Sequence, residues 1–228
     1  MNRKILFAIP ARGGSKRLPR KNLVKLGGQP MLAFTIQAAL ESGLSDDVYV
    51  CTEDSEIATV AEEYGARVHW IPTEMSGDEV SSTIPCLDLM SSLLEAGLSF
   101  DYLCNLQPSS PLRTAEDVRN SLEWIKETGS DFLVSVTATD PHYFHWAMVN
   151  DSDVWRMYFR EEFLKERTQL PPVYRPNGAI KLARASAVKE VSNFFGQPST
   201  VYHMPEERSI HVATDFDLRC SAGVLNGV

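Results

Sequence analysis

The sequence has no long hydrophobic run. No apolar stretch among its 228 residues approaches the ~20 residues that a membrane-spanning helix needs. Residues 1–4 lead into only five apolar residues before Pro10, which does not fit a secretory signal peptide. We therefore expect a cytoplasmic protein with no membrane partner.

Cysteine and positive charge are also scarce. The four cysteines form no C-x-x-C pair, and Cys51 and Cys104 end apolar runs typical of strands. This pattern indicates buried thiols in a reducing compartment rather than a zinc site. The formal net charge of −8 argues against a nucleic-acid-binding surface. The composition, 43% hydrophobic and 23% charged, fits one globular domain over residues 1–228.

The few cations gather in one place. Five of the 22 Lys and Arg residues lie within residues 9–22, together with Gly13, Gly14 and no acid. The apolar run at residues 5–9 predicts a buried strand directly before them. Adjacent glycines let backbone N–H groups approach an anion and the cations supply countercharge, so we interpret this loop as a polyphosphate site. It matches neither the Walker A pattern nor G-x-G-x-x-G, and a solvated basic loop is the alternative.

Strand and helix patterns alternate further along the chain. Strands are predicted at 47–52, 67–71, 101–106 and 132–136, and helices at 30–42, 54–64, 82–96 and 114–127. This order predicts an α/β fold with a mostly parallel sheet covered by helices. Ligands of such sheets lie outside the carboxyl ends of the strands. We therefore expect the loops at 12–22, 76–83 and 107–114 to converge there.

Residues 142–174 break this alternation. They are rich in aromatic side chains and contain only short strand-like pieces. An excursion of this composition into solvent would be an apolar surface suited to self-association. An ordinary aromatic subcore is the alternative.

Four segments resemble motifs of the acylneuraminate cytidylyltransferases, or CMP-sialic acid synthetases. The family's A-R-x-x-S-K-x-x-x-x-K-N pattern is matched by Ala11, Arg12, Ser15, Lys16, Lys21 and Asn22. Residues 106–114 differ at one position from the family's L-Q-P-T-S-P-L-R-T loop, and residues 175–180 are identical to its R-P-N-G-A-I segment. The S-D-T-A-S-S loop is matched at Asp78, Ser81 and Ser82. Taken alone, these serines are equally typical of a helix N-cap, and Asn177-Gly178 of a turn.

The resemblance implies a Rossmann-like, nucleotide-diphospho-sugar transferase type of fold, with helices on both faces of the sheet. It implies catalytic roles for Arg12, Lys16 and Lys21, and sugar contacts by Gln107, Arg175 and Asn177. Nucleotide contacts fall to Ala11, Arg12, Gly13, Ser15, Asn22, Asp78 and Ser82. It also implies a homodimer, in which residues 142–174 reach the partner's sugar site, and a Mg²⁺ or Mn²⁺ cofactor.

The metal site departs from the family pattern. The family's S-I-D-I-D-T segment places two aspartates where this chain has His211 and Ala213. Magnesium prefers oxygen ligands, so neither replacement suits it. Asp215 and Asp217 would take over the metal after a shift of two residues, or the triphosphate would hold it, or transfer activity would be lost. His211 as a ligand of a softer metal is a further alternative to a packed histidine.

The function implied by the resemblance is attack by the anomeric hydroxyl of a nine-carbon acid sugar, of the sialic or legionaminic type, on the α-phosphate of CTP. Pyrophosphate would leave and a CMP-sugar would form. A synthetase for Kdo-type octulosonic acids is an alternative, although its Q-G-D-E-P loop is absent. A relative that binds nucleotide without transferring it is the other alternative, because of His211 and Ala213.

Overall fold

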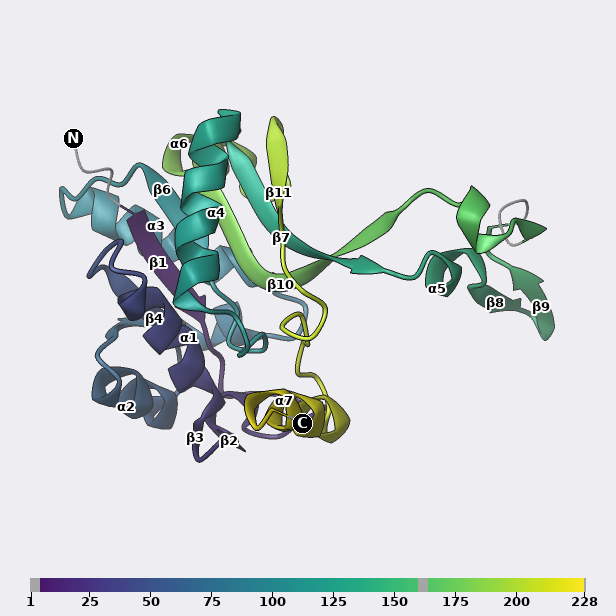
Figure 1. Ribbon diagram of the computed structural model, residues 1–228. Coiled ribbons are helices and arrows are strands. Elements are labelled where there is room, and N and C mark those ends of the chain that lie inside the picture. Colours follow the sequence, from purple (N-terminus) through teal and green to yellow (C-terminus); the bar gives the residue numbers. More distant parts are fainter. Residues whose placement is uncertain (1–4, 160–163, 228) are drawn as a thin grey trace.

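The computed structural model describes residues 5–159 and 164–227. A seven-stranded sheet, in the order β11-β7-β10-β6-β1-β4-β5, forms the centre of the molecule (Figure 1). Its strands are β1 (Ile5–Pro10), β4 (Val48–Thr52), β5 (Arg67–Trp70), β6 (Tyr102–Asn105), β7 (Phe132–Thr139), β10 (Val173–Arg184) and β11 (Ser199–His203). All neighbouring pairs are parallel except those of β10, which runs antiparallel to β6 and β7.

Helices cover both faces of the sheet, which confirms the predicted fold class. They are α1 (Met31–Glu41), α2 (Ser55–Glu63), α3 (Thr83–Glu95), α4 (Ala115–Thr128), α6 (Ala185–Val191) and α7 (Asp215–Leu225). Alternation along β1 divides the core: Phe7 packs in one cluster with residues of α1, α2 and α4, while Leu6 packs in another with residues of α3 and α6. None of the helices in the described part of the chain is long and apolar enough to cross a bilayer.

Side-chain caps begin three of these helices, and at α7 the cap is a capping box of Thr214 and Asp217. The Asp54 carboxylate accepts hydrogen bonds from the first turn of α2, and Thr114 and Asp117 form a capping box at α4. A short hairpin of β2 (Lys25–Leu26) and β3 (Gln29–Pro30) follows the basic loop. Helix α7 lies beside this hairpin, and its Leu218 and Ala222 pack against the cluster that contains the buried Leu26 (Figure 1).

Strands β7 and β10 run beyond the sheet into an arm, which projects from the rest of the molecule (Figure 1). The arm carries α5 (His142–His145) and a hairpin of β8 (Met148–Asp151) and β9 (Val154–Met157). Large apolar side chains are exposed along it, among them Tyr143, Trp146, Trp155 and Tyr158. The described residues of the range 142–174 therefore form an excursion into solvent and not an aromatic subcore.

Strand β10 was not predicted from the sequence. Pro176 and Gly178 interrupt its apolar pattern, and its register shifts between Pro176 and Lys181. Such irregularities mark a bulge, which local patterns do not distinguish from a turn.

Candidate active site

A cavity of about 230 Å³ opens at the carboxyl ends of β1 and β6. Its walls come from residues 10–22 after β1, residues 71–85 leading into α3, and residues 107–109 after β6, with His211 also lining it. The predicted convergence of three loops is confirmed. Of the predicted site residues, the cavity is lined by Ala11, Arg12, Ser15, Lys21, Asn22, Ser82, Gln107 and His211.

Two of the expected phosphate ligands bind a carboxylate in this structure. Arg12 Nη2 lies 2.7 Å from Asp78 Oδ1, and Lys16 Nζ lies 2.6 Å from Asp78 Oδ2. The hydrogen bond from Lys16 and the charge of both cations hold the pKa of Asp78 below its ordinary value. A second bond, from Arg12 Nη1 to the carbonyl of Ser76, ties the same guanidinium to the loop before α3. Asp78 thus occupies the cations that the sequence assigns to the nucleotide.

Lys21 and Asn22 form the other end of the basic loop. Burial, together with the nearby Arg17 and Arg12, lowers the pKa of Lys21 from its ordinary value. Its ammonium therefore gains from a bound anion. The buried Asn22 donates from Nδ2 to the backbone carbonyl of Arg12, at 2.9 Å, and so fixes the start of the loop relative to its end.

The loop is anchored on the side facing α2. Arg20, in the left-handed region at φ 54°, pairs with Asp54 and Glu56. The Gly13 N–H donates to Glu53 Oε1 at 2.9 Å, and a Cβ on Gly13 would lie 2.3 Å from the Asp54 carboxylate. The Gly13 N–H is therefore hydrogen-bonded within the protein, although the motif resemblance assigned Gly13 to the nucleotide.

A buried guanidinium fixes the opposite wall. Gln107 donates from Nε2 to Ser82 Oγ at 3.1 Å, which joins the two side chains expected at the base and sugar. Behind them Arg113 donates to the carbonyls of Gln107 and Ala179, at 2.6 and 2.8 Å, and to Thr35 Oγ1 at 3.0 Å. Burial lowers the pKa of Arg113 to about 10. Sequence reasoning gave Arg113 no role, since nothing local distinguishes it from a residue before a helix cap.

Arg175 and Asn177 do not line the cavity. Asn177 is buried and donates from Nδ2 to Ser209 Oγ at 2.9 Å, while its Oδ1 accepts from Ser135 Oγ at 2.5 Å. Arg175 lies 3.5 Å from the carbonyl of Ser209. Both residues therefore hold the chain segment that precedes His211. In the described part of this chain they support the site, and the sequence had assigned them to the sugar itself.

His211 faces the cavity beside Gln107. Its Nδ1 lies 3.4 Å from Ser109 Oγ, and a Cβ on Gly178 would approach the same nitrogen to 3.3 Å and Gln107 Oε1 to 3.0 Å. Gly178 also has φ +74°, so glycine is required there on both counts. Burial, and then the charge of Lys21, lower the pKa of His211 to about 4, so the imidazole is neutral at physiological pH.

The two aspartates after His211 are used elsewhere. Asp217 Oδ2 accepts from the backbone N–H groups of Ala213 and Thr214, at 3.0 and 2.8 Å, and from the Thr214 hydroxyl at 2.8 Å. Burial opposes ionisation of Asp217, but these hydrogen bonds outweigh it and lower its pKa. Asp215 is exposed and pairs with Arg219 one helical turn away. Neither carboxylate lines the cavity, because both belong to the first turn of α7.

The donor set does not fit a divalent ion held by the protein. In residues 5–159 and 164–227, no three His, Cys, Asp or Glu side chains are grouped to hold a metal. The cavity is lined by Arg12 and Lys21 and by no carboxylate, whereas magnesium prefers oxygen ligands. The expected shift of the metal to Asp215 and Asp217 has no support in this geometry.

Comparison with known proteins identifies the family of this chain. A family model described as cytidylyltransferase matches residues 6–216. The chain is 36% identical to CMP-N,N'-diacetyllegionaminic acid synthase of Legionella pneumophila, over 86% of this chain and 84% of that protein. It is 31% identical to pseudaminic acid cytidylyltransferase of Campylobacter jejuni, over 94% and 93%. It is also 31% identical to N-acylneuraminate cytidylyltransferase of Escherichia coli, over 96% of this chain and 52% of that protein.

Solved structures agree on the fold. The structure of a CMP:2-keto-3-deoxy-manno-octonic acid synthetase complexed with CTP matches with a TM-score of 0.74 at 18% identity, covering 98% of this chain and 99% of the other. At that identity the match bears on the fold alone. The family model and the relatives extend along most of the sequence and agree with the motif resemblance. This chain therefore belongs to the cytidylyltransferase family, a family of nucleotidyltransferase enzymes.

Proposed function

We propose that this protein is a CMP-acid-sugar synthetase. It transfers CMP from CTP to the anomeric hydroxyl of a nine-carbon 2-keto-3-deoxy acid sugar of the sialic or legionaminic type. The observation that carries the proposal is one cavity in which Arg12 and Lys21 face the Ser82–Gln107 pair. This is a cationic end beside neutral hydrogen-bonding groups, which suits a triphosphate joined to a base and a sugar. The names of the relatives support the choice of substrates.

Charge and position supply most of the catalysis in this proposal. Arg12, Lys16 and Lys21 neutralise the triphosphate and stabilise the pyrophosphate as it leaves. For Arg12 and Lys16 this requires the nucleotide to replace the Asp78 carboxylate. Ser82 and Gln107 orient the cytosine and the sugar, so that the anomeric oxygen lies in line with the bond that breaks.

The identities to the relatives favour a legionaminic-type sugar over pseudaminic acid. The relative named for diacetyllegionaminic acid shares 36% identity, against 31% for the relative named for pseudaminic acid. The octulosonic acid synthetase shares 18% and supports only a common fold. We also place the reaction in the cytoplasm, since Cys51, Cys86 and Cys104 are buried free thiols suited to a reducing compartment.

The arm is proposed to complete the site in a homodimer. Its exposed aromatic side chains form an apolar surface on a chain whose formal net charge is −8. Pairing of two arms would bury this surface and would bring each arm tip to the other subunit.

Pyrophosphate release from CTP tests the proposal. The assay uses N-acetylneuraminic, legionaminic, pseudaminic and Kdo-type acids as acceptors, with and without Mg²⁺ or Mn²⁺. We expect turnover with a sialic- or legionaminic-type acid, and a CMP-sugar detected by mass spectrometry. Binding of CTP without turnover of any acceptor would instead support a nucleotide-binding relative that has lost transfer activity.

A further inference from the structure

We infer that this chain binds its triphosphate through its own cations and has no divalent-metal site of its own, because positions 211 and 213 offer no carboxylate. This inference rests on the proposed function. It reverses the expectation, drawn from the motif resemblance, that the protein holds Mg²⁺ or Mn²⁺.

The carboxylates nearest the cavity each make at least one contact within the protein. Asp78 binds Arg12 and Lys16, and Glu53 accepts from the Gly13 amide. Asp217 accepts three hydrogen bonds at the start of α7. Glu53 Oε2 is buried without a hydrogen-bond partner, but one such oxygen does not make a metal site, since no three His, Cys, Asp or Glu side chains are grouped to hold a metal among the described residues.

The neighbours of His211 also disfavour a cation. Its Nδ1 already lies within reach of Ser109 Oγ, and the positive charges of Lys21, Arg17 and Arg175 act on the ring. A divalent ion placed beside His211 would be repelled by these three charges, which the single negative charge of Asp217 does not balance, and it would gain at most one nitrogen ligand. Opposite charge is the natural occupant of this space, so the triphosphate fits where a metal ion does not. A divalent ion that accompanies the nucleotide would be bound by phosphate oxygens.

Two binding measurements on the wild-type protein test the inference without any turnover. The first is calorimetric titration of CTP in EDTA and in Mg²⁺, where we expect affinities that agree within about threefold. The second is Mn²⁺ titration without nucleotide, followed by electron paramagnetic resonance, where we expect no bound Mn²⁺. A fall in CTP affinity of more than about tenfold in EDTA, or stoichiometric Mn²⁺ binding, would overturn the inference.

A gain-of-site variant tests the two positions directly. The double substitution His211→Asp/Ala213→Asp is expected to bind Mn²⁺ without nucleotide and to lose about tenfold in CTP affinity in EDTA, since it adds one negative charge in the cavity and a second one two residues away. The single variant Ala213→Asp serves if the double variant does not fold, and thermal melting with and without Mn²⁺ reports both folding and binding. A folded variant that ignores Mn²⁺ would overturn the assignment to these positions.

One control and one comparison separate the possible failures. The variant Asp215→Asn changes an exposed helix-pair residue and is expected to leave CTP and Mn²⁺ behaviour as in the wild type. A loss of CTP affinity in that variant would indicate that Asp215 is a metal ligand and would overturn the inference. CTP that binds in neither buffer would overturn the proposed function, whereas CTP that binds only with metal would overturn this inference alone.

Discussion

Lys21 is a half-buried cation in a positive environment. Its replacement is expected to lower activity without lowering stability. Burial and the charges of Arg17 and Arg12 already disfavour its ammonium, so Lys21→Met should leave the melting temperature unchanged or higher. Loss of its charge should lower kcat/KM by about 100-fold, the scale of losing one donor to a developing anion. Steady-state pyrophosphate release measures the rate, with the exposed Lys189→Met as control. Equal rates for both variants would remove Lys21 from the catalytic set.

His211 predicts a loss of stability in mild acid. Its pKa is about 4 in the folded protein and close to the ordinary 6.5 in an unfolded chain. Between these values the unfolded chain binds more protons, so the free energy of unfolding falls as pH falls. At pH ~5 the loss is about 2 kcal/mol.

The variant His211→Asn should lack this contribution. Urea unfolding at pH ~7.5 and ~5 measures it, and we expect the wild type to lose more stability than the variant over this range. An identical loss in both proteins would mean that the imidazole titrates normally.

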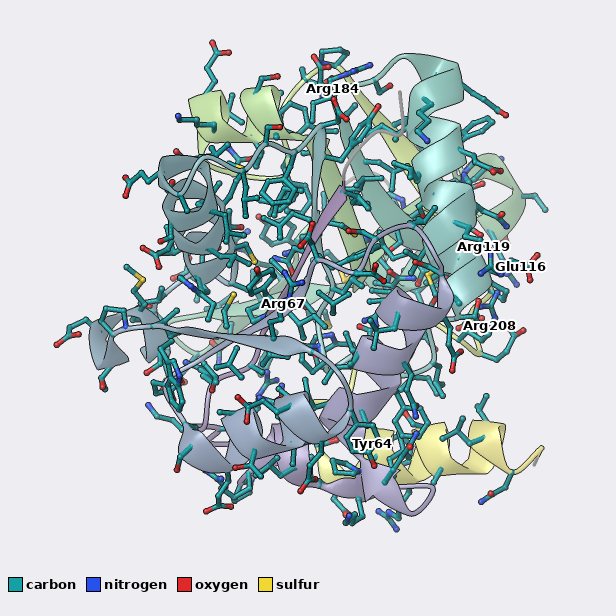
Figure 2. The ribbon with its side chains drawn as sticks, turned by 90° about the vertical axis from the view of Figure 1, so that its left-hand side faces the viewer. Tyr64, Arg67, Glu116, Arg119, Arg184 and Arg208 are labelled. Atoms are coloured by element: carbon teal, nitrogen blue, oxygen red, sulfur yellow. The ribbon has the colours of Figure 1, made fainter. Side chains whose placement is uncertain are left out.

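The irregular segment between β11 and α7 is the element that carries Ser209 and His211 to the site. Arg208 fastens it to the first turn of α4, where its guanidinium pairs with the buried carboxylate of Asp117 and lies 3.4 Å from Thr114 Oγ1. Figure 2 shows Arg208 beside the end of α4 that carries Glu116. Because this segment has no strand or helix of its own, side-chain contacts and the backbone hydrogen bond from Val212 N–H to the carbonyl of Ser109 decide where His211 lies.

Removal of this pair should loosen the segment. Arg208→Met leaves Asp117 buried without its cation, which we expect to cost about 2 kcal/mol in urea unfolding and to lower kcat/KM further. Arg219→Met is the matched control, because it breaks an exposed pair with Asp215 and should cost less than ~0.5 kcal/mol. Similar costs for the two variants would show that Arg208 has no special structural role.

At the scale of the whole molecule, the arm predicts the oligomeric state. Trp155 is 64% exposed on β9 and lies in a hairpin with little core of its own. If the arms pair, Trp155→Asp should convert a dimer to a monomer, measured by analytical ultracentrifugation. Trp70→Asp is the control, because Trp70 is 58% exposed at the end of β5 in the body of the protein. A wild-type monomer would contradict the proposed interface.

The sequence was most informative where local patterns suffice. The buried strand β1 and the helices α2 and α4 were predicted, because each depends on neighbours within a few residues. The convergence of three loops followed from their order after parallel strands. Strand β10 was not predicted, because a bulge interrupts its pattern and its antiparallel partners β6 and β7 are far away in the chain.

The roles of the site residues were likewise predictable only where they depend on local sequence. The density of charge at Arg12 to Lys21 is visible in the sequence, and the structure places Arg12 and Lys21 in the cavity. Whether a carboxylate or an amide is free is not visible there. Asp217 and Asn177 have the right chemistry for ligands, yet the fold uses both to hold neighbouring segments. Hydrogen bonds with distant partners decided this.

The sequence by itself determined the family, the α/β architecture and the position of the polyphosphate loop, since these follow from residue type and spacing along the chain. The tertiary structure alone decided which charges remain available: Asp78 binds the cations of the loop, Arg113 is buried behind Gln107, and no described carboxylate lines the cavity. The physical reason is that a charged group is available to a ligand only if no neighbouring residue already binds it. Folding brings such neighbours together, and their separation in the chain carries no information about their contact.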